Sequence, residues 1–252
     1  MTGVTAHRTV VVAAHGTRDP AGVVVARRLV TALRARLPGT AVRLAFVDVL
    51  GPSVHEVVAD VPGSVTVVPA FLSSGYHVRT DVPREVAVTG RRDVTVTAAL
   101  GPDWLLVETL RDRLRAAGWR SGDAVVLAAA GSSDPRAVAD VRTAAAQLSD
   151  VLGHRVRAGF VATGAPRVTD LIAGLRAAGE PRVAVASWLL APGLFHRRLA
   201  YVRADVVAAP LGVHPAVVDR LAQLADAPAR GAVSMHTVPI EPLIGAFCIQ
   251  NA

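Results

Sequence analysis

Short apolar runs alternate along the chain with longer segments in which apolar residues recur at helical spacing. The runs are rich in Val and Ala without strict alternation, which is typical of strands buried in a parallel sheet; they cover residues 9–14, 41–47, 65–69 and 94–98. The helical segments cover residues 21–37, 52–60, 81–89 and 103–117. Asp103 is a suitable N-cap for the last of these helices and Gly118 a suitable stop. This order predicts a layered α/β fold with right-handed crossovers.

The same pattern then recurs. Arg43-Leu-Ala-Phe-Val aligns with Arg157-Ala-Gly-Phe-Val at an offset of 114 residues. His15-Gly-Thr-Arg-Asp-Pro aligns with Ala130-Gly-Ser-Ser-Asp-Pro at 115, and Leu72-Ser-Ser-Gly with Leu190-Ala-Pro-Gly at 118. We therefore predict two tandem homologous three-layer α/β/α units, residues 1–120 and 121–228. A duplication of this kind replaces a two-fold dimer, so we expect a monomer with internal pseudo-two-fold symmetry.

The pattern ends after Pro228. Residues 229–252 are expected to form either a strand added to the other unit or a disordered tail, and we favour the tail.

Composition narrows the classes of protein. The chain has 252 residues, is 52% apolar and 19% charged, and carries a net charge of +7 in which all 27 basic residues are Arg. These arginines are scattered over predicted helices rather than clustered among aromatic residues, so we do not expect nucleic-acid binding. The single cysteine, Cys248, excludes an internal disulfide framework and a Cys-based zinc site. The apolar runs are too short to cross a bilayer and the first residues lack the plan of a signal peptide, so we expect no membrane association and a cytoplasmic location.

Two histidines follow strands of the first unit. His15 comes after the first strand and His77 after the third, and Gly16 and Gly75 beside them permit sharp turns. Because the carboxyl ends of parallel strands share one edge, both imidazoles are expected to face one cleft. Neutral imidazole binds divalent metals and accepts protons near neutral pH. The plainer interpretation is that each is an ordinary surface loop residue.

Asp48 follows the second strand at the same edge. Its carboxylate is suited to orient a histidine, accept a proton or join a metal's ligands. A local hydrogen bond within a turn explains it equally well. The second unit has Ala130 where the first has His15, and Ala162 where the first has Asp48. His196 aligns with His77 only after a one-residue shift, so we expect one full site, in the first unit.

These residues resemble the sirohydrochlorin chelatase family, the class II chelatases that insert iron or cobalt into tetrapyrroles. The resemblance rests on three stretches: Ala14-His-Gly-Thr-Arg-Asp-Pro20, Ala45-Phe-Val-Asp48 with Pro52-Ser53, and Pro69-Ala-Phe-Leu-Ser-Ser-Gly-Tyr-His-Val-Arg79. It covers residues 9–118 strongly and 123–227 more weakly, in the long form with two repeats. Many members have Glu where this chain has Asp48.

The resemblance implies insertion of Fe²⁺ or Co²⁺ into sirohydrochlorin, in siroheme or cobalamin biosynthesis, with no organic cofactor. It implies that His15 and His77 are the catalytic and metal-binding histidines, with Asp48 as a further candidate ligand. The substrate rim carries acetate and propionate groups, which arginine pairs well. The residues expected to contact the substrate are Ser73, Ser74, Gly75, Tyr76, Arg79, Arg197 and Arg198, with Arg84 as a weaker candidate. Each arginine is otherwise explained as a solvated helix residue.

Two other functions fit the same residues. A non-catalytic protein that binds metal or tetrapyrrole would use the same histidines. A histidine-phosphatase-like hydrolase is similar in its strand-end His-Gly, but Ala14 stands where such enzymes place the Arg that holds phosphate.

Overall fold

The computed structural model describes residues 8–227. Its strands form two parallel four-stranded sheets of identical topology, β2-β1-β3-β4 and β6-β5-β7-β8. The first sheet contains β1 (Arg8–Ala14), β2 (Ala41–Phe46), β3 (Ser64–Pro69) and β4 (Val94–Val96). The second contains β5 (Ala124–Gly131), β6 (Val156–Thr163), β7 (Val183–Trp188) and β8 (Val206–Val207). The predicted α/β fold with tandem parallel sheets is confirmed. Residues 229–252, predicted to be a tail, lie outside the described residues.

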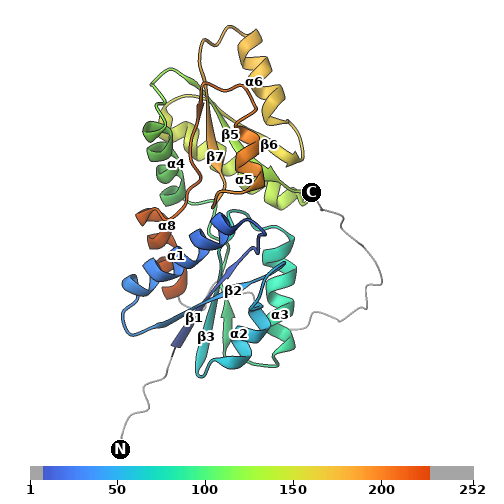
Figure 1. Ribbon diagram of the computed structural model, residues 1–252, viewed down its shortest axis with the longest axis vertical. Coiled ribbons are helices and arrows are strands. Elements are labelled where there is room, and N and C mark those ends of the chain that lie inside the picture. The colour runs from blue at the N-terminus through green and yellow to red at the C-terminus, as the bar shows by residue number, and fades with distance from the viewer. Residues whose placement is uncertain (1–7, 228–252) are drawn as a thin grey trace, which may run out of the picture.

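Helices cover both faces of each sheet (Figure 1). Those of the first half are α1 (Pro20–Arg36), α2 (Val54–Asp60), the short π-helix η1 (His77–Asp81), α3 (Val82–Val88) and α4 (Trp104–Ala116). Those of the second half are α5 (Pro135–Leu152), α6 (Val168–Ala177), α7 (Leu194–Leu199) and α8 (Pro215–Asp226).

The last helix of each half packs on the sheet of the other half. Helix α4 contacts α5 and β7, whereas α8 contacts α1 and β3, and α4 and α8 also contact each other. Figure 1 shows α8 beside α1 in the lower lobe and α4 in the upper lobe. One apolar core therefore runs through both halves, from Val10 and Leu33 through Leu110 to Leu127 and Leu221. Each repeat of the sequence forms one of the two sheets, but the last helix of each repeat packs on the sheet of the other repeat.

The internal repeat is visible in local structure as well. Asp19 caps α1 and Asp134 caps α5, and in each case the side chain accepts a hydrogen bond from the backbone N–H two residues later. Isolated parallel bridges join Phe46 to Ser53 and Phe160 to Arg167, at the same offset of 114 residues. The predicted cap of α4 is also present, since Asp103 accepts from the N–H of Leu105.

The helical segment that leads into α3 begins four residues earlier than the sequence pattern predicts. A helix is predicted from residue 81, whereas the π-turn η1 begins at His77, with the Val82 N–H donating to the His77 carbonyl. Pro83 has no N–H to donate to the carbonyl of Arg79, so an α-helical bond is missing there and a wider turn fits. This turn places His77 on the first turn of a helix rather than in a loop.

Candidate functional site

His15 stands at the carboxyl end of β1, one of the two inner strands of the first sheet. β1 ends at Ala14, and Gly16 follows His15 immediately. A Cβ on Gly16 would lie 1.6 Å from the carbonyl oxygen of Asp48, so the backbones of these two loops touch at a position that only glycine allows. This close approach fixes the direction in which the His15 side chain leaves the sheet.

His77 approaches the same edge from the neighbouring strand. The segment after β3 runs past Phe71 to the π-turn, and the ring centroids of His77 and His15 lie 5.1 Å apart. Phe71 packs against both imidazoles, with centroid distances of 6.2 Å to His15 and 5.9 Å to His77. Two imidazoles that each bind an ion at about 2 Å can be up to about 6 Å apart between centroids. The pair is thus close enough to share one divalent ion.

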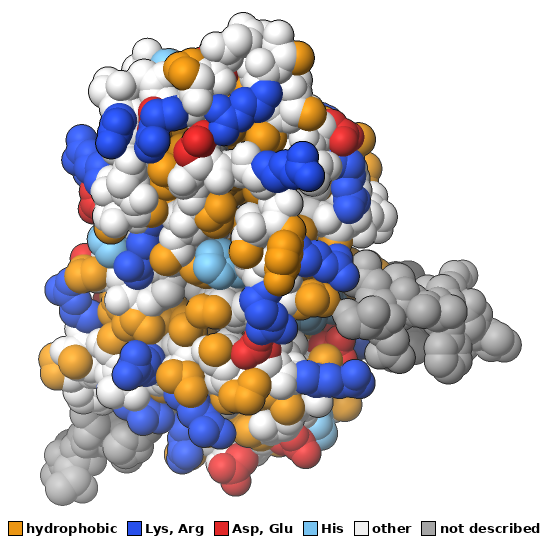
Figure 2. Space-filling model, turned by 45° about the horizontal axis from the view of Figure 1, so that its top comes forward, with side chains coloured by type: hydrophobic (Ala, Val, Ile, Leu, Met, Phe, Trp, Pro, Cys, Tyr) orange, Lys and Arg blue, Asp and Glu red, His pale blue; other side chains and the backbone are white. Residues whose placement is uncertain are grey.

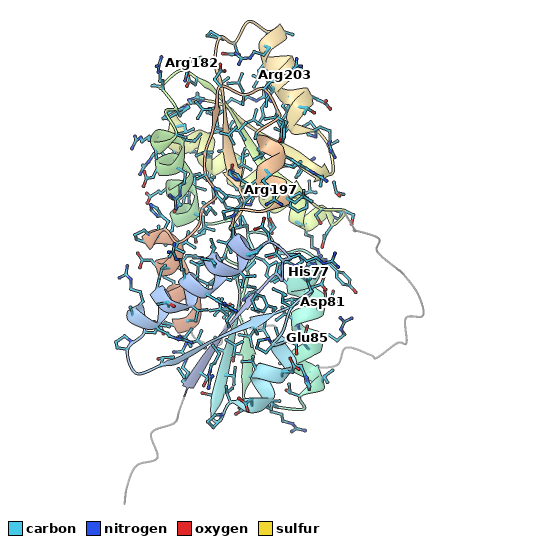
Figure 3. The ribbon with its side chains drawn as sticks, in the orientation of Figure 1. His77, Asp81, Glu85, Arg182, Arg197 and Arg203 are labelled. Atoms are coloured by element: carbon cyan, nitrogen blue, oxygen red, sulfur yellow. The ribbon has the colours of Figure 1, made fainter. Side chains whose placement is uncertain are left out.

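Asp81 is hydrogen-bonded to the Nδ1 atom of His77. The Nδ1 atom of His77 lies 2.7 Å from Oδ2 of Asp81, whose other oxygen accepts from Arg84 at 2.8 Å. Asp81 is 8% exposed, so its charge is largely removed from water and compensated by these two partners. A proton on Nδ1 donated to Asp81 leaves the lone pair of Nε2 available for a metal or a proton. Figure 3 shows His77, Asp81 and Glu85 in succession along η1 and α3.

The protein around His15 favours its neutral form. Burial of the ring is the main cause that lowers the pKa of His15, and the nearby His77 lowers it further, while Asp48 acts in the opposite direction. The residue nevertheless keeps an exposed side at the sheet edge. A neutral imidazole that stays accessible is suited to bind a metal ion and to accept a proton.

Asp48 lies near His15, but it does not form a group of three metal ligands with His15 and His77. Its carboxylate accepts a hydrogen bond from the Val49 N–H at 2.7 Å, as the turn interpretation expects. Within residues 8–227, no three His, Cys, Asp or Glu side chains are grouped so as to hold a metal ion. Asp48 therefore acts on His15 through its charge, and its role as a ligand stays a prediction.

Two of the four arginines expected at the substrate rim have partners in the opposite half. Arg79 donates to Asp134, and Arg197 donates to Asp19. In Figure 3, Arg197 lies in the upper lobe, facing the end of the lower lobe that carries His77. Arg84 bonds Asp81 instead, and Arg198 lies beside a small hollow between β6, α6 and α7.

The segment from Ser73 to Tyr76 lines the boundary between the halves. The N–H of Ser74 donates to Asp140 of α5 at 2.7 Å, and a Cβ on Gly75 would lie 3.5 Å from the Cβ of Ala137. Tyr76 is 56% exposed, and its ring meets the His77 ring edge-on at a centroid distance of 6.5 Å. Tyr76 is therefore the apolar group of this segment most accessible to a ligand.

In the described part of the second half, no histidine pair stands at the equivalent positions. Ala130, within the last residues of β5, stands where His15 follows β1, and the residue aligned with His77 is Phe195, which packs against the local core. His196 turns to the carbonyl of Ala208, with Nε2 3.3 Å away. Sequence reasoning missed Asp81, Asp19 and Asp134; the spacing of four residues from His77 to Asp81 was the available signal for the first.

The histidine pair lies at an open edge rather than in an enclosed cavity. A hollow of about 500 Å³ lies between Arg36 and Asp219, and neither histidine lines it. Figure 2 shows arginines spread over the visible face between apolar side chains, with no single basic patch. No helix in the described part of the chain is both long and apolar enough to cross a membrane.

The fold and the paired histidines define a duplicated α/β protein whose candidate metal site lies in one half. The model of the CbiX family matches residues 9–117 and 124–227. The chain belongs to this family, and its resemblance to the sirohydrochlorin chelatases is confirmed.

Solved structures agree on the fold. SirB from Bacillus subtilis with Fe³⁺ is similar with a TM-score of 0.75 and 20% identity, over 86% of this chain and 94% of that one. SirB from Bacillus subtilis subspecies spizizenii in complex with cobalt has a TM-score of 0.73 and 21% identity, over 90% and 99%. DR2241 from Deinococcus radiodurans has a TM-score of 0.70 and 23% identity, over 90% of this chain and 57% of that one. A search of curated protein sequences found no significant match.

Proposed function

We propose that this protein inserts a divalent metal, Fe²⁺ or Co²⁺, into sirohydrochlorin, as a step of siroheme or cobalamin biosynthesis. The observation that carries the proposal is the pair of imidazoles, His15 and His77, 5.1 Å apart at the open edge of the first sheet. Family membership and the SirB structures with iron and cobalt support it. Metal and tetrapyrrole are both substrates, and no organic cofactor is needed. The cytoplasm remains the predicted compartment.

Insertion must remove two pyrrole protons while the metal changes ligands. His15 and His77 would hold the ion through neutral nitrogens, which bind it less firmly than a site with several carboxylates or thiolates. As the ion's bonds pass to the ring nitrogens, the two imidazoles become free to accept the two protons and pass them to water. The charge balances, because one divalent ion enters the ring as two protons leave it.

The two histidines have different surroundings suited to these tasks. His77 is oriented by Asp81, which stabilises the protonated imidazole when it forms. Burial lowers the pKa of His15, so it is available as a neutral ligand at neutral pH. We assign the larger share of proton acceptance to His77, whose Nδ1 has the Asp81 carboxylate as its partner.

The test is the formation of metallated sirohydrochlorin, followed by its absorption spectrum with Co²⁺ or with Fe²⁺ under anaerobic conditions. We expect wild type to exceed the spontaneous rate and His15→Ala and His77→Ala to fall towards it. His55→Ala is the matched control, since His55 lies on α2 and is expected to retain full activity. Competition between the two metals in the same assay measures the preference.

Other outcomes identify the alternative functions. Saturable metal or tetrapyrrole binding with no rate above the spontaneous one would indicate a non-catalytic binding protein. Hydrolysis of p-nitrophenyl phosphate that is lost in His15→Ala would indicate a phosphatase.

A further inference from the structure

Two ion pairs cross the boundary between the halves in a pseudo-symmetric arrangement. Arg79 of the first half donates to Asp134 of the second, and Arg197 of the second half donates to Asp19 of the first. The offsets are those of the repeat: 115 residues from Asp19 to Asp134 and 118 from Arg79 to Arg197. The two pairs are therefore equivalent positions of the duplicated unit, retained on both sides.

Retention of both pairs contrasts with the loss of the second histidine site. Ala130 and Phe195 replace the histidines in the second half, and the Ser74–Asp140 contact has no equivalent because Pro192 and Val25 stand in the corresponding places. A substrate held across the boundary needs a metal site on one side but charged groups on both. The arginines fit that requirement.

Each pair includes a residue close in sequence to one of the two histidines. Arg79 follows His77 by two residues on η1, and Asp19, the partner of Arg197, follows His15 by four. The two guanidinium groups thus come from opposite halves, and each ion pair includes a residue close in sequence to a different histidine. A planar molecule with carboxylates around its rim, centred on the histidines, would meet one arginine on each side.

Each aspartate can release its arginine without losing its own role in the fold. Oδ1 of Asp19 accepts from the Ala21 N–H at 3.0 Å, and Oδ1 of Asp134 accepts from the Arg136 N–H at 2.9 Å. The arginines bond the second oxygen, Oδ2, in both cases. Helix capping and ion pairing therefore use separate atoms of the same carboxylate.

The arginine side of each pair is open to water, whereas the Asp19 and Asp134 side chains are only 15% and 14% exposed and keep their cap hydrogen bonds. The Arg197 side chain is 63% exposed and the Arg79 side chain 33%. Ion pairs open to water contribute little net stability, because solvent screens them and ordering two long side chains opposes them. When a ligand carboxylate replaces the aspartate as the arginine's partner, the aspartate keeps the hydrogen bond from the helix N-terminus that compensates part of its charge.

We propose that Arg79 and Arg197 are a matched pair of receptors for two carboxylates of the substrate, and that Asp19 and Asp134 occupy them until the substrate binds. The proposal rests on the proposed function, since a tetrapyrrole polycarboxylate supplies the exchanging groups. Binding then replaces two internal ion pairs by two substrate ion pairs that span the boundary.

The test is equilibrium binding of metal-free sirohydrochlorin, followed by absorbance and fluorescence. Asp19→Asn and Asp134→Asn keep the cap oxygen but weaken the hold on the arginine. We expect each variant to lower Kd about 2- to 5-fold, because substrate binding no longer has to break an ion pair between the arginine and a charged aspartate. Arg79→Gln and Arg197→Gln are each expected to raise Kd about 10-fold or more.

Double variants separate exchange from a structural role. In Asp134→Asn/Arg79→Gln, and likewise in Asp19→Asn/Arg197→Gln, the aspartate change is expected to have no effect beyond that of the arginine change. The matched control is Asp219→Asn, which breaks the exposed Arg36–Asp219 pair away from the histidines and is expected to leave Kd unchanged.

If Asp→Asn and Arg→Gln weaken binding alike, or if neither alters it, the pairs are structural and the proposal is wrong. Because the two pairs are separate, either one tests it if a variant of the other does not fold. If wild type binds and metallates sirohydrochlorin but Asp19→Asn and Asp134→Asn do not lower Kd, the proposed exchange of partners is wrong and the proposed chelatase function stands. Absence of saturable binding and of metallation by wild type would overturn both.

Discussion

The Cα of Gly16 faces the carbonyl oxygen of Asp48 so closely that a Cβ would lie 1.6 Å from it. Gly16→Ala must therefore separate the loop that carries His15 from the loop that carries Asp48. We expect a loss of about 1–3 kcal/mol in the free energy of unfolding and weaker Co²⁺ binding, because His15 moves with its loop.

Urea unfolding and Co²⁺ titration measure these two effects. Gly174→Ala is the matched control, since Gly174 lies within helix α6 with nothing within 4 Å of a Cβ. That change is expected to stabilise the protein by up to about 1 kcal/mol. Equal stability of Gly16→Ala and wild type would show that the loops are not held by this contact.

Asp81 is predicted to act through His77. In Asp81→Ala the imidazole loses the acceptor at Nδ1, so we expect Co²⁺ affinity to fall about 10- to 100-fold, as is usual when the partner of a ligating histidine is removed. Asp81→Asn keeps an oxygen that can accept from Nδ1 and is expected to restore part of the affinity. Calorimetric titration of Co²⁺ measures this series.

A purely structural role for Asp81 predicts a different result. It would lower the free energy of unfolding in both variants without the graded recovery of metal affinity in Asp81→Asn. Asp60→Asn serves as the control, because Asp60 is an exposed residue at the end of α2.

The sequence could predict the parts of this site that depend on strand ends. His15 and His77 follow neighbouring parallel strands, so their meeting at one edge follows from β1–β3 pairing. The partners Asp19 and Asp134 could not be predicted in this way, because their ion pairs depend on how the two halves face each other. The sequence also could not predict that α4 and α8 each pack on the sheet of the other half. The pattern of an amphipathic helix shows which face is buried but not which sheet that face covers.

The pH dependence of stability should carry the signature of His15. Because its folded pKa lies below the value of about 6.5 usual for unfolded histidine, the folded state binds fewer protons than the unfolded state in this range. Stability is therefore expected to fall as pH drops below about 6.5, and this part of the loss should be absent in His15→Gln. Urea unfolding of wild type and His15→Gln between about pH 7.5 and about pH 5, a range that spans the usual histidine pKa, measures whether the two proteins lose stability differently.

Proton NMR of the imidazole gives a direct check. The His15 midpoint is expected below the usual value, to rise in His77→Ala because a neighbouring positive charge is removed, and to fall further in Asp48→Asn. A His15 midpoint that does not move in either variant would contradict the assigned causes.

Arg91 is expected to be important for the stability of the first half. Its guanidinium donates to three backbone carbonyls at the end of α2 and in the loop to β3, those of Val58, Val61 and Gly63. Arg91→Met is expected to cost about 2–3 kcal/mol in the free energy of unfolding, because three charged hydrogen bonds to backbone carbonyls, two of them part-buried, are lost together. Arg92→Met, at the exposed neighbouring position, is the control and should be within about 0.5 kcal/mol of wild type.

The exchanged helices predict that the two halves unfold together. Leu110 of α4 and Leu221 of α8 are fully buried in the core that extends through both sheets. Leu221→Ala is expected to cost about 2–5 kcal/mol and to lower the unfolding midpoint of both halves, since α8 covers the first sheet while its chain belongs to the second. Tryptophan fluorescence, which includes Trp188 of β7, and far-UV circular dichroism should report one coincident urea transition in wild type and variant. Two separate transitions, or a fragment of residues 1–120 that folds as a stable monomer, would show that the exchanged helices do not couple the halves.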